Sequence, residues 1–277
     1  MKIAYLGPAG TFTEDALRET RPDGDYEPLR MPTIHDSIVA VERGEADRAL
    51  VPIENSLEGS VRRTLDALAF EVSNVTMVGE HDFRVHVHLI ARPGVSIEAV
   101  EAVLSHPQPL AQCQYFLRDR LGGSELRNVS STAAAVRMVS ESPRPWAALG
   151  SRSAAVLYGC ELLCEGVEDQ DDNVTRFVWI APAGTEPTGT GPWKTSLVFS
   201  EVGADHPGAL VDCLAEFSRR GINLTRIESR PMRQGLGRYM FFCDLEGALA
   251  DAAVTEAIGE LHQKAGSVRI LGSYPLG

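Results

Sequence analysis

The chain of 277 residues divides at a stretch that reads Ala181-Pro182-Ala183-Gly184-Thr185-Glu186-Pro187-Thr188-Gly189-Thr190-Gly191-Pro192. Proline, glycine and threonine dominate this stretch and it has almost no apolar content, which predicts a linker rather than a packed element. The chain is long enough for two domains that each bury a core. We therefore expect a first domain over residues 1–183, a linker over 184–193 and a second domain over 194–277.

The C-terminal part has a pattern that indicates its fold class. Strands and helices are predicted, in chain order, at residues 195–202, 207–220, 222–229, 238–245, 251–265 and 268–271. Gly221 and Gly266 stand where glycines end helices, and Asp251 can cap the second helix. The order is βαββαβ. This is the ferredoxin-like arrangement, an antiparallel sheet with two helices on one face.

The N-terminal part alternates strands and helices. Strands are predicted at residues 2–6, 48–53, 83–91 and 147–149, and helices begin near Thr11, near Ser56 or Ser60, and at Ser151. This repetition predicts an α/β domain with a largely parallel sheet and helices on both faces. In such folds ligands bind outside the carboxyl ends of the strands, so residues that follow strands are the candidates for a site.

Small hydroxyl and amide side chains follow these strands. They are Thr11, Asn55, Ser56, Ser105, Ser131, Thr132 and Ser151. At a helix start, free backbone N–H groups and the helix dipole favour an anion, so several such starts in one cleft could hold carboxylates. Taken singly, each residue is also an ordinary helix cap, and Thr11 with Glu14 has the spacing of a capping box.

A second candidate is the tripeptide Thr175-Arg176-Phe177, which closes the acidic run 168–173 and opens an apolar strand. A hydroxyl next to a guanidinium offers a neutral proton donor beside a planar clamp for a carboxylate, which suits chemistry on a small acid. The alternative is a surface arginine paired with the acidic run, because short motifs match by chance.

The composition narrows the function classes. The net charge of −12 argues against non-specific nucleic-acid binding, and no apolar run approaches the roughly 20 residues that a membrane span requires. Five scattered cysteines without a CxxC pair fit a reducing cytoplasm. His81, His86 and His88 lack partners at ligand spacing, so we expect neither a metal nor another cofactor.

Four segments of the first domain and two of the second resemble the motifs of prephenate dehydratase and its ACT regulatory domain. They are Gly7-Pro8-Ala9-Gly10-Thr11-Phe12, residues 51–59 (Val-Pro-Ile-Glu-Asn-Ser-Leu-Glu-Gly), Ser105-His106-Pro107-Gln108, Asn173-Val174-Thr175-Arg176-Phe177, Pro207-Gly208-Ala209-Leu210 and Glu228-Ser229-Arg230-Pro231. The resemblance implies a catalytic domain of two lobes, similar to type 2 periplasmic binding proteins, with the active site between them. One lobe would combine residues 1–77 and 166–183, and the other would span 78–165.

The resemblance also implies a reaction, the conversion of prephenate to phenylpyruvate, water and CO₂ in phenylalanine biosynthesis. Thr175 would be catalytic and would donate a hydrogen bond to the leaving hydroxyl, directly or through water. Arg176 would clamp the side-chain carboxylate. The remaining substrate-binding residues would be Phe177, Thr11, Asn55, Ser56, Ser105, Ser131, Thr132 and Ser151.

The implied ACT domain would bind phenylalanine between subunits of a homodimer or homotetramer and thereby inhibit the enzyme allosterically. The implied effector residues are Gly208, Ala209, Leu210, Val211, Asn223, Leu224, Glu228, Ser229, Arg230 and Pro231. Two alternatives stay open at this point. One is the same chemistry on arogenate, which a carboxylate facing the substrate's side chain would favour, and the other is a non-catalytic amino-acid sensor.

Overall fold

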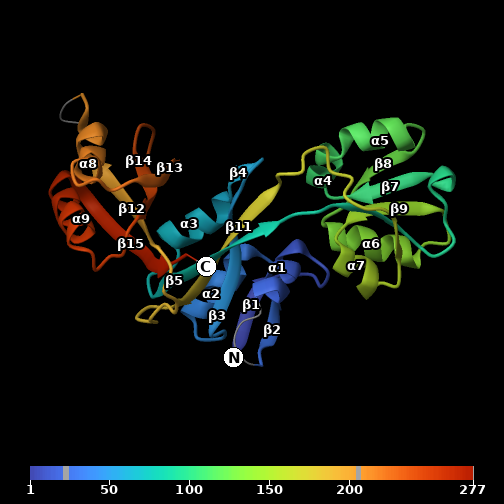
Figure 1. The fold of residues 1–277 in the computed structure, drawn as a ribbon, viewed down its shortest axis with the longest axis horizontal. Coiled ribbons are helices and arrows are strands. Elements are labelled where there is room, and N and C mark those ends of the chain that lie inside the picture. Colours follow the sequence, from blue (N-terminus) through green and yellow to red (C-terminus); the bar gives the residue numbers. More distant parts are fainter. Residues whose placement is uncertain (21–24, 204–206, 277) are drawn as a thin grey trace.

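The computed structural model describes residues 1–20, 25–203 and 207–276, so the last residue of the expected second domain lies outside it. Three bodies follow one another along the long axis of the molecule (Figure 1). The C-terminal domain lies at one end, and two lobes of the N-terminal domain occupy the middle and the other end. The N-terminus lies in the middle body, and Leu276, the last described residue, packs against the core of that body.

A ten-stranded sheet runs through the middle body and on into the C-terminal domain, in the order β13-β14-β12-β15-β5-β11-β3-β1-β2, with β4 paired to β3. Its N-terminal strands are β1 (Lys2–Leu6), β2 (Glu27–Met31), β3 (Arg48–Asn55), β4 (Gly59–Ser60), β5 (Val75–Arg84) and β11 (Val174–Pro182). With helices α1 (Phe12–Thr20), α2 (Ile34–Glu42) and α3 (Arg62–Phe70), these strands form the first lobe. The two domains join at one parallel pair, Met77 of β5 beside Gly272 of β15 (Ala265–Pro275).

Helices cover both faces of the first lobe's sheet, as expected for an α/β domain. Successive strand residues point to opposite faces. Ala4 and Val51 therefore belong to the core beneath α2 and α3, while Ile3 and Leu50 belong to the core that α1 shares. The sheet is less parallel than expected, because β11 returns antiparallel to both of its neighbours, β3 and β5.

The second lobe holds a five-stranded sheet in the order β10-β6-β9-β7-β8. Its elements are β6 (His88–Ala91), β7 (Ala102–Ser105), β8 (Glu125–Asn128), β9 (Trp146–Gly150), β10 (Glu161–Cys164), a 3₁₀ turn (Ile97–Ala99), α4 (Pro107–Gln112), α5 (Gln114–Leu121), α6 (Thr132–Glu141) and α7 (Arg152–Leu157). The single strand expected over 83–91 is wrong, because β5 ends at Arg84 and β6 begins at His88. Since β5 stays in the large sheet throughout, the chain leaves the first lobe after residue 84 rather than near 77.

Two crossing segments, residues 85–87 and 165–173, connect the lobes side by side. Val85 N–H donates to Asn173 O at 2.8 Å, and Val167 N–H donates to Val87 O at 2.9 Å. Burial lowers the pKa of His88, and nearby Arg152 lowers it further. The neutral ring accepts a hydrogen bond from Gly166 N at 3.2 Å, which ties the start of β6 to the returning segment.

The C-terminal domain has the predicted βαββαβ order. Its elements are β12 (Trp193–Val202), α8 (Ala209–Ser218), β13 (Leu224–Pro231), β14 (Tyr239–Glu246), α9 (Ala252–Lys264) and β15. The expected stop at Gly266 is wrong, since α9 runs directly into β15 at Ala265. Asp251 is the N-cap residue of α9, but its carboxylate accepts from Ala248 N at 2.8 Å rather than from a helix N–H.

Both faces of this C-terminal sheet are covered. One face packs on α8 and α9 through residues such as Phe199 and Cys243. The other face contributes Met240, Phe242 and Tyr274 to the core beneath α2 and α3 of the first lobe. The domain is therefore docked on the first lobe through a continuous apolar core as well as through the strand pair. Within the described residues, every helix is too short or too polar to cross a membrane.

Candidate active site

A cavity of about 290 Å³ opens between the two lobes, close to the lower end of the roughly 300–1,000 Å³ typical of small-molecule sites. The first lobe and the crossing segments contribute Leu6, Thr11, Phe12, Thr13, Pro52, Asn55, Val85, Asn173, Thr175 and Phe177. The second lobe contributes His106, Gln108, Pro109, Gln112, Ser130, Ser131 and Thr132. Most of these residues follow the carboxyl ends of β1, β3, β7 and β8, where α/β folds bind ligands.

The hydroxyl of Thr175 has a defined role as a hydrogen-bond acceptor. Thr175 lies in β11 directly opposite Asn55 of β3, and the Asn55 side-chain amide lies 2.9 Å from Thr175 Oγ1. Asn55 Oδ1 accepts from Leu57 N and Glu58 N, both at 3.0 Å, so the other end of the amide must be the NH₂ group that faces Thr175. Because the amide donates, the hydroxyl proton of Thr175 is directed elsewhere.

A chain of amides extends from this pair across the cleft. Asn55 Nδ2 donates to Asn173 Oδ1 at 2.7 Å, and Asn173 Nδ2 donates to Gln112 Oε1 of α4 at 3.2 Å. Gln112 Nε2 is buried and has no hydrogen-bond partner among the described residues. The chain of amides thus ends at an unpartnered N–H donor that is shielded from solvent beneath the cavity wall. Neither Gln112 nor Asn173 is among the site residues predicted from the sequence, although Asn173 begins the segment that contains Thr175-Arg176-Phe177.

Two helix N-termini face the cavity. Ser131 caps α6 by accepting from Ala134 N at 3.1 Å, and Thr132 follows it in the lining. Thr11 precedes α1, donates to Leu6 O at 3.1 Å and accepts from Glu14 N at 3.4 Å, while Glu14 accepts from Gly10 N at 2.7 Å. The lining includes no Arg, Lys, Asp or Glu among the described residues. An anionic ligand would therefore depend on N–H and O–H donors and helix dipoles.

Four predicted substrate residues lie outside the cavity lining, and three of them are serines. Ser56 Oγ donates to Asp172 O at 2.8 Å and accepts from Val174 N at 2.9 Å, so it anchors the segment before Thr175. Ser105 is fully buried and bonds to Leu149 O. Ser151 caps α7 and donates to Gly10 O at 3.1 Å, which links the two lobes. These side chains hold the walls rather than a ligand.

Arg176 does not lie where a substrate clamp would be. Its neighbours in β11, Thr175 and Phe177, line the cavity, and adjacent strand residues point to opposite faces. The guanidinium instead reaches the C-terminal domain, where Arg176 Nη2 lies 2.7 Å from Asp244 Oδ2. Arg176 therefore does not form the predicted clamp for a substrate carboxylate in this cavity. Phe177 is buried and packs edge-on against Phe83 with ring centroids 6.3 Å apart, so it supplies an apolar wall.

Two further groups near the cavity have structural roles. His106 is the N-cap of α4, and its Nδ1 accepts from Gln108 N at 3.3 Å. Burial raises the pKa of the Cys113 thiol to about 12, and the Asp169 and Glu168 carboxylates raise it as well. Cys113 is therefore no thiolate nucleophile at neutral pH.

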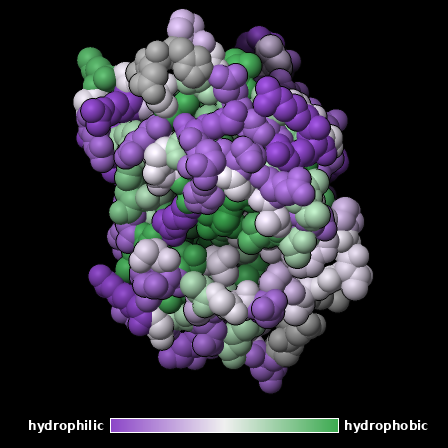
Figure 2. All heavy atoms as spheres, turned by 90° about the vertical axis from the view of Figure 1, so that its left-hand side faces the viewer, coloured by the Kyte–Doolittle hydropathy of each residue, from purple (hydrophilic) through white to green (hydrophobic). Residues whose placement is uncertain are grey.

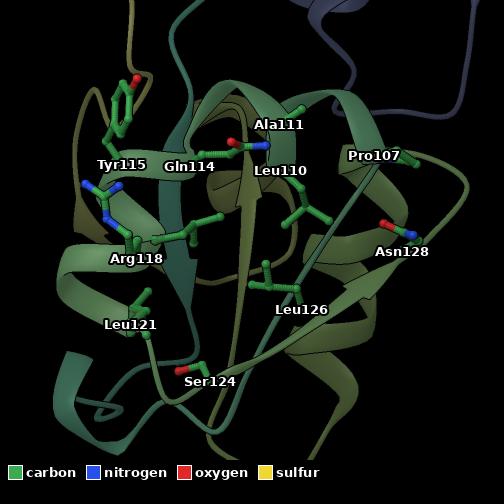
Figure 3. A pocket seen from close by; sticks show the side chains of 12 residues that line it. Pro107, Leu110, Ala111, Gln114, Tyr115, Arg118, Leu121, Ser124, Leu126 and Asn128 are labelled. Carbon is green, nitrogen blue, oxygen red and sulfur yellow. The ribbon is translucent and has the colours of Figure 1, made fainter.

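A larger hollow of about 610 Å³ lies apart from this cleft, between α4, α5 and β8 (Figure 3). Leu110, Leu121 and Leu126 line its apolar part, and Tyr115 and Arg118 stand at its rim. None of the predicted site residues lines it. The hydroxyl and amide groups that converge on the interlobe cavity make that cavity the stronger candidate site.

Only two of the predicted effector residues, Ala209 and Leu210, line a hollow in the C-terminal domain, which measures about 550 Å³ and is bordered by Tyr239 and Phe241. Gly208 caps α8 with a left-handed φ of 100°, and Val211 is exposed on the same helix.

The other predicted effector residues lie on or beside β13. Asn223 bonds to Glu246, and Leu224 packs in the domain core. Arg230 Nη2 lies 2.6 Å from Asp66 of α3, so it faces the first lobe and not the hollow. Glu228, Ser229 and Pro231 lie along β13 outside the hollow.

Comparisons with known proteins agree with this architecture. Residues 3–185 match the family model of prephenate dehydratase, and residues 196–263 match that of the ACT domain. A curated prephenate dehydratase from Mycobacterium marinum is 43% identical over 284 residues, which cover 100% of this chain and 89% of the relative.

Two solved structures are similar along the full length. A prephenate dehydratase from Arthrobacter aurescens in complex with L-Phe has a TM-score of 0.91 and 38% identity, over 99% of this chain and 90% of that one. GqqA, described as a novel type of quorum quenching acylase, has a TM-score of 0.88 and 31% identity, over 100% of this chain and 98% of that one. The chain belongs to the prephenate dehydratase family and carries a C-terminal ACT domain.

Proposed function

We propose that this enzyme converts prephenate into phenylpyruvate, water and CO₂, a step of phenylalanine biosynthesis, with Thr175 as the catalytic residue. The observation that carries the proposal is the hydrogen bond from Asn55 Nδ2 to Thr175 Oγ1. This hydrogen bond leaves the hydroxyl proton of Thr175 available for donation to a ligand in the cavity. The N–H and O–H donors of the cavity suit a dicarboxylate.

The reaction requires few catalytic groups from the protein. Loss of CO₂ and hydroxide makes the ring of prephenate aromatic, so the enzyme has to position the substrate and help hydroxide leave. A threonine hydroxyl is a weak acid, and Thr175 therefore acts mainly by hydrogen-bond stabilisation of the departing oxygen. The N-termini of α1 and α6 are available to orient the carboxylates.

The cavity favours prephenate over arogenate, which carries an ammonium where prephenate has a keto group. A site for the ammonium would need a carboxylate facing it. The described lining residues include neither Asp nor Glu. Release of phenylpyruvate from prephenate, measured with arogenate in parallel, tests this preference.

GqqA is described as an acylase, which would act by amide hydrolysis. The described residues of the cavity do not support that reaction for this chain. A hydroxyl nucleophile needs a base within hydrogen-bond reach to take its proton. Among the described residues, Thr175 Oγ1 accepts a hydrogen bond from the Asn55 amide, and an amide N–H cannot act as the base that removes the hydroxyl proton. Dehydration of prephenate requires no such base.

Replacing Thr175 tests the proposed catalytic role. We expect Thr175→Ala to lower kcat by about 10²–10⁴-fold, the usual contribution of a positioned proton donor. Thr175→Ser keeps the hydroxyl and should retain most of the activity. Thermal unfolding of both variants controls for folding. Near wild-type turnover by a folded Thr175→Ala protein would show that another group assists the leaving hydroxide.

We further propose that phenylalanine binds the ACT domain and inhibits the enzyme, and that the protein is a cytoplasmic homodimer or homotetramer. The hollow beside Ala209 and Leu210 at the start of α8 supports an amino-acid site. Among the described residues, no strand pairs with the outer side of β13, which leaves that side for pairing with a second copy, and Ile227 of this strand is 48% exposed. Figure 2 shows apolar surface in a hollow of this end of the molecule, bordered by hydrophilic side chains.

A further inference from the structure

A buried cluster of charges lies between the catalytic domain and the ACT domain. Arg176 Nη2 contacts Asp244 Oδ2 at 2.7 Å and Glu54 Oε2 at 2.9 Å, and Arg176 Nη1 lies 3.3 Å from Glu80 Oε2. Lys194 Nζ of the ACT domain lies 2.5 Å from Glu80 Oε1. The Arg176 and Asp244 side chains are only 11% and 3% exposed, so their contact is shielded from water, whereas Glu54 lies at the exposed edge of the cluster.

The cluster is built jointly by the two domains. The catalytic domain supplies Arg176, Glu54 and Glu80, and the ACT domain supplies Lys194 and Asp244 with their neutral partners. Ser196 Oγ donates to Asp244 Oδ1 at 2.7 Å, and Tyr274 Oη donates to Glu80 Oε2 at 3.2 Å. Burial would lower the pKa of Arg176, but Asp244 and Glu80 outweigh it and raise that pKa. The Arg176 guanidinium is therefore charged, and carboxylates from both domains bind it.

The same cluster contacts β11 at Arg176, the residue next to Thr175. Arg176 directly follows Thr175 in β11, with the hydroxyl facing the cavity and the guanidinium facing the ACT domain. The register of β11 against β3 shifts between Arg176 and Phe177. The pairing of β11 with β3 is thus irregular just after Arg176, whereas its pairing with β5 stays in register there.

The cluster also reaches the free edge of the ACT sheet. Arg226 of β13 is 7% exposed and lies 3.8 Å from both Asp244 Oδ2 and Glu54 Oε2. The next residue, Ile227, is exposed on the other face of the same strand. A shift of β13 on binding an effector or a second subunit would therefore move Arg226 against Asp244.

We propose that Arg176 is a positioning residue that ties Thr175 to the ACT domain through Asp244, and that this contact transmits the effector signal to the catalytic hydroxyl. The inference rests on the proposed function. Removing one member of a buried ion cluster leaves the others unpaired, so the arrangement responds sharply to small displacements. Misplacing a reacting group by about 1 Å can lower a rate about 100-fold.

The test uses the full-length protein with Asp244→Asn, which keeps the shape of the side chain and an oxygen for Ser196. We expect kcat for phenylpyruvate release to fall by about 10- to 100-fold with KM changed by less than about 3-fold. Phenylalanine should inhibit this variant at least about 5-fold more weakly than it inhibits the wild type, which is the low end of usual allosteric couplings. Direct calorimetric titration should still detect phenylalanine binding.

Asp66→Asn is the matched control. Asp66 also crosses between the domains, with Arg230 Nη2 at 2.6 Å and Arg233 Nη2 at 2.7 Å, but it belongs to α3 and its ion-pair partners belong to the ACT domain rather than to β11. This variant should keep the kcat of the wild type measured without phenylalanine. If both variants lose kcat equally, a general weakening of domain docking explains the loss and the inference is overturned.

Arg176→Lys provides a second measurement if Asp244→Asn folds poorly. Lysine keeps the charge but lacks the planar fork that bridges Asp244, Glu54 and Glu80 at once. It should show the same loss of kcat at nearly constant KM. Wild-type kcat and inhibition in either folded variant would refute the inference, whereas a wild-type protein that releases no phenylpyruvate would refute the proposed function instead.

Discussion

At the scale of single residues, the site depends on the direction of one hydrogen bond. Asn55 accepts from two backbone N–H groups and donates to Asn173 and Thr175, so its amide has one possible orientation. That orientation leaves the Thr175 proton free. The side chain next to the catalytic hydroxyl thus decides whether that hydroxyl can donate to a substrate.

Asn55→Asp reverses this direction while keeping the size of the side chain. The carboxylate can still accept from Leu57 N and Glu58 N, but it cannot donate to Thr175 Oγ1, so the hydroxyl would donate to the carboxylate. We expect kcat for phenylpyruvate release to fall by about 10²-fold or more.

A melting temperature within several degrees of the wild type would show that Asn55→Asp is folded. Unchanged turnover in that folded variant would mean that Thr175 does not act through a proton directed by Asn55.

At the scale of elements, the two faces of one strand serve two purposes. β11 presents Thr175 and Phe177 to the cavity and Arg176 to the ACT domain. On the far side of β5, Gly272 of β15 pairs with Met77 and completes the continuous sheet. The docking of the ACT domain therefore requires a glycine at this contact, since a Cβ atom would lie 2.2 Å from Met77 O and 2.6 Å from Met77 Cβ.

Gly272→Ala should destabilise the protein by about 1–3 kcal/mol, the usual cost of overpacking a tight contact. Gly259→Ala in α9 is the matched control, because a Cβ there meets nothing within 4 Å. Alanine is the better helix former, so this control should be more stable than wild type by about 0.5–1 kcal/mol. Urea unfolding measures both, and equal stability of the two variants would contradict the contact seen between β5 and β15.

At the scale of the whole molecule, the ACT domain lies at one end of the long axis and the second lobe at the other (Figure 1). The large sheet ends at β13, whose outer side has no strand partner within the described residues. Long unpaired edges with exposed apolar side chains favour pairing with another chain. The proposed homo-oligomer would continue the sheet across two ACT domains.

Ile227→Lys places a charge on this edge and should shift the protein towards a monomer of 30.0 kDa. Val156→Lys is the control, because Val156 is 77% exposed on α7 in the second lobe, far from β13 in the fold. Light scattering after size exclusion measures the mass of each variant. An Ile227→Lys protein with the mass of the wild type would exclude β13 as the subunit interface.

The amino-acid sequence by itself determined the elements with strong local patterns. The βαββαβ order follows from glycine and hydrophobic periodicity, which act over a few residues. The gathering of Thr11, Asn55, Thr175 and Phe177 at one cavity could also be expected from the resemblance of their motifs.

Only the tertiary structure decided where Arg176 points and what Gln112 faces. The apolar pattern placed the strand at 177–180, whereas β11 already begins at Val174, so Thr175 and Arg176 alternate between faces instead of sharing a loop. Asp244 and Gln112 are 68 and 64 residues from Arg176 along the chain. Contacts at such separation come from the packing of lobes and domains, which local residue patterns do not encode.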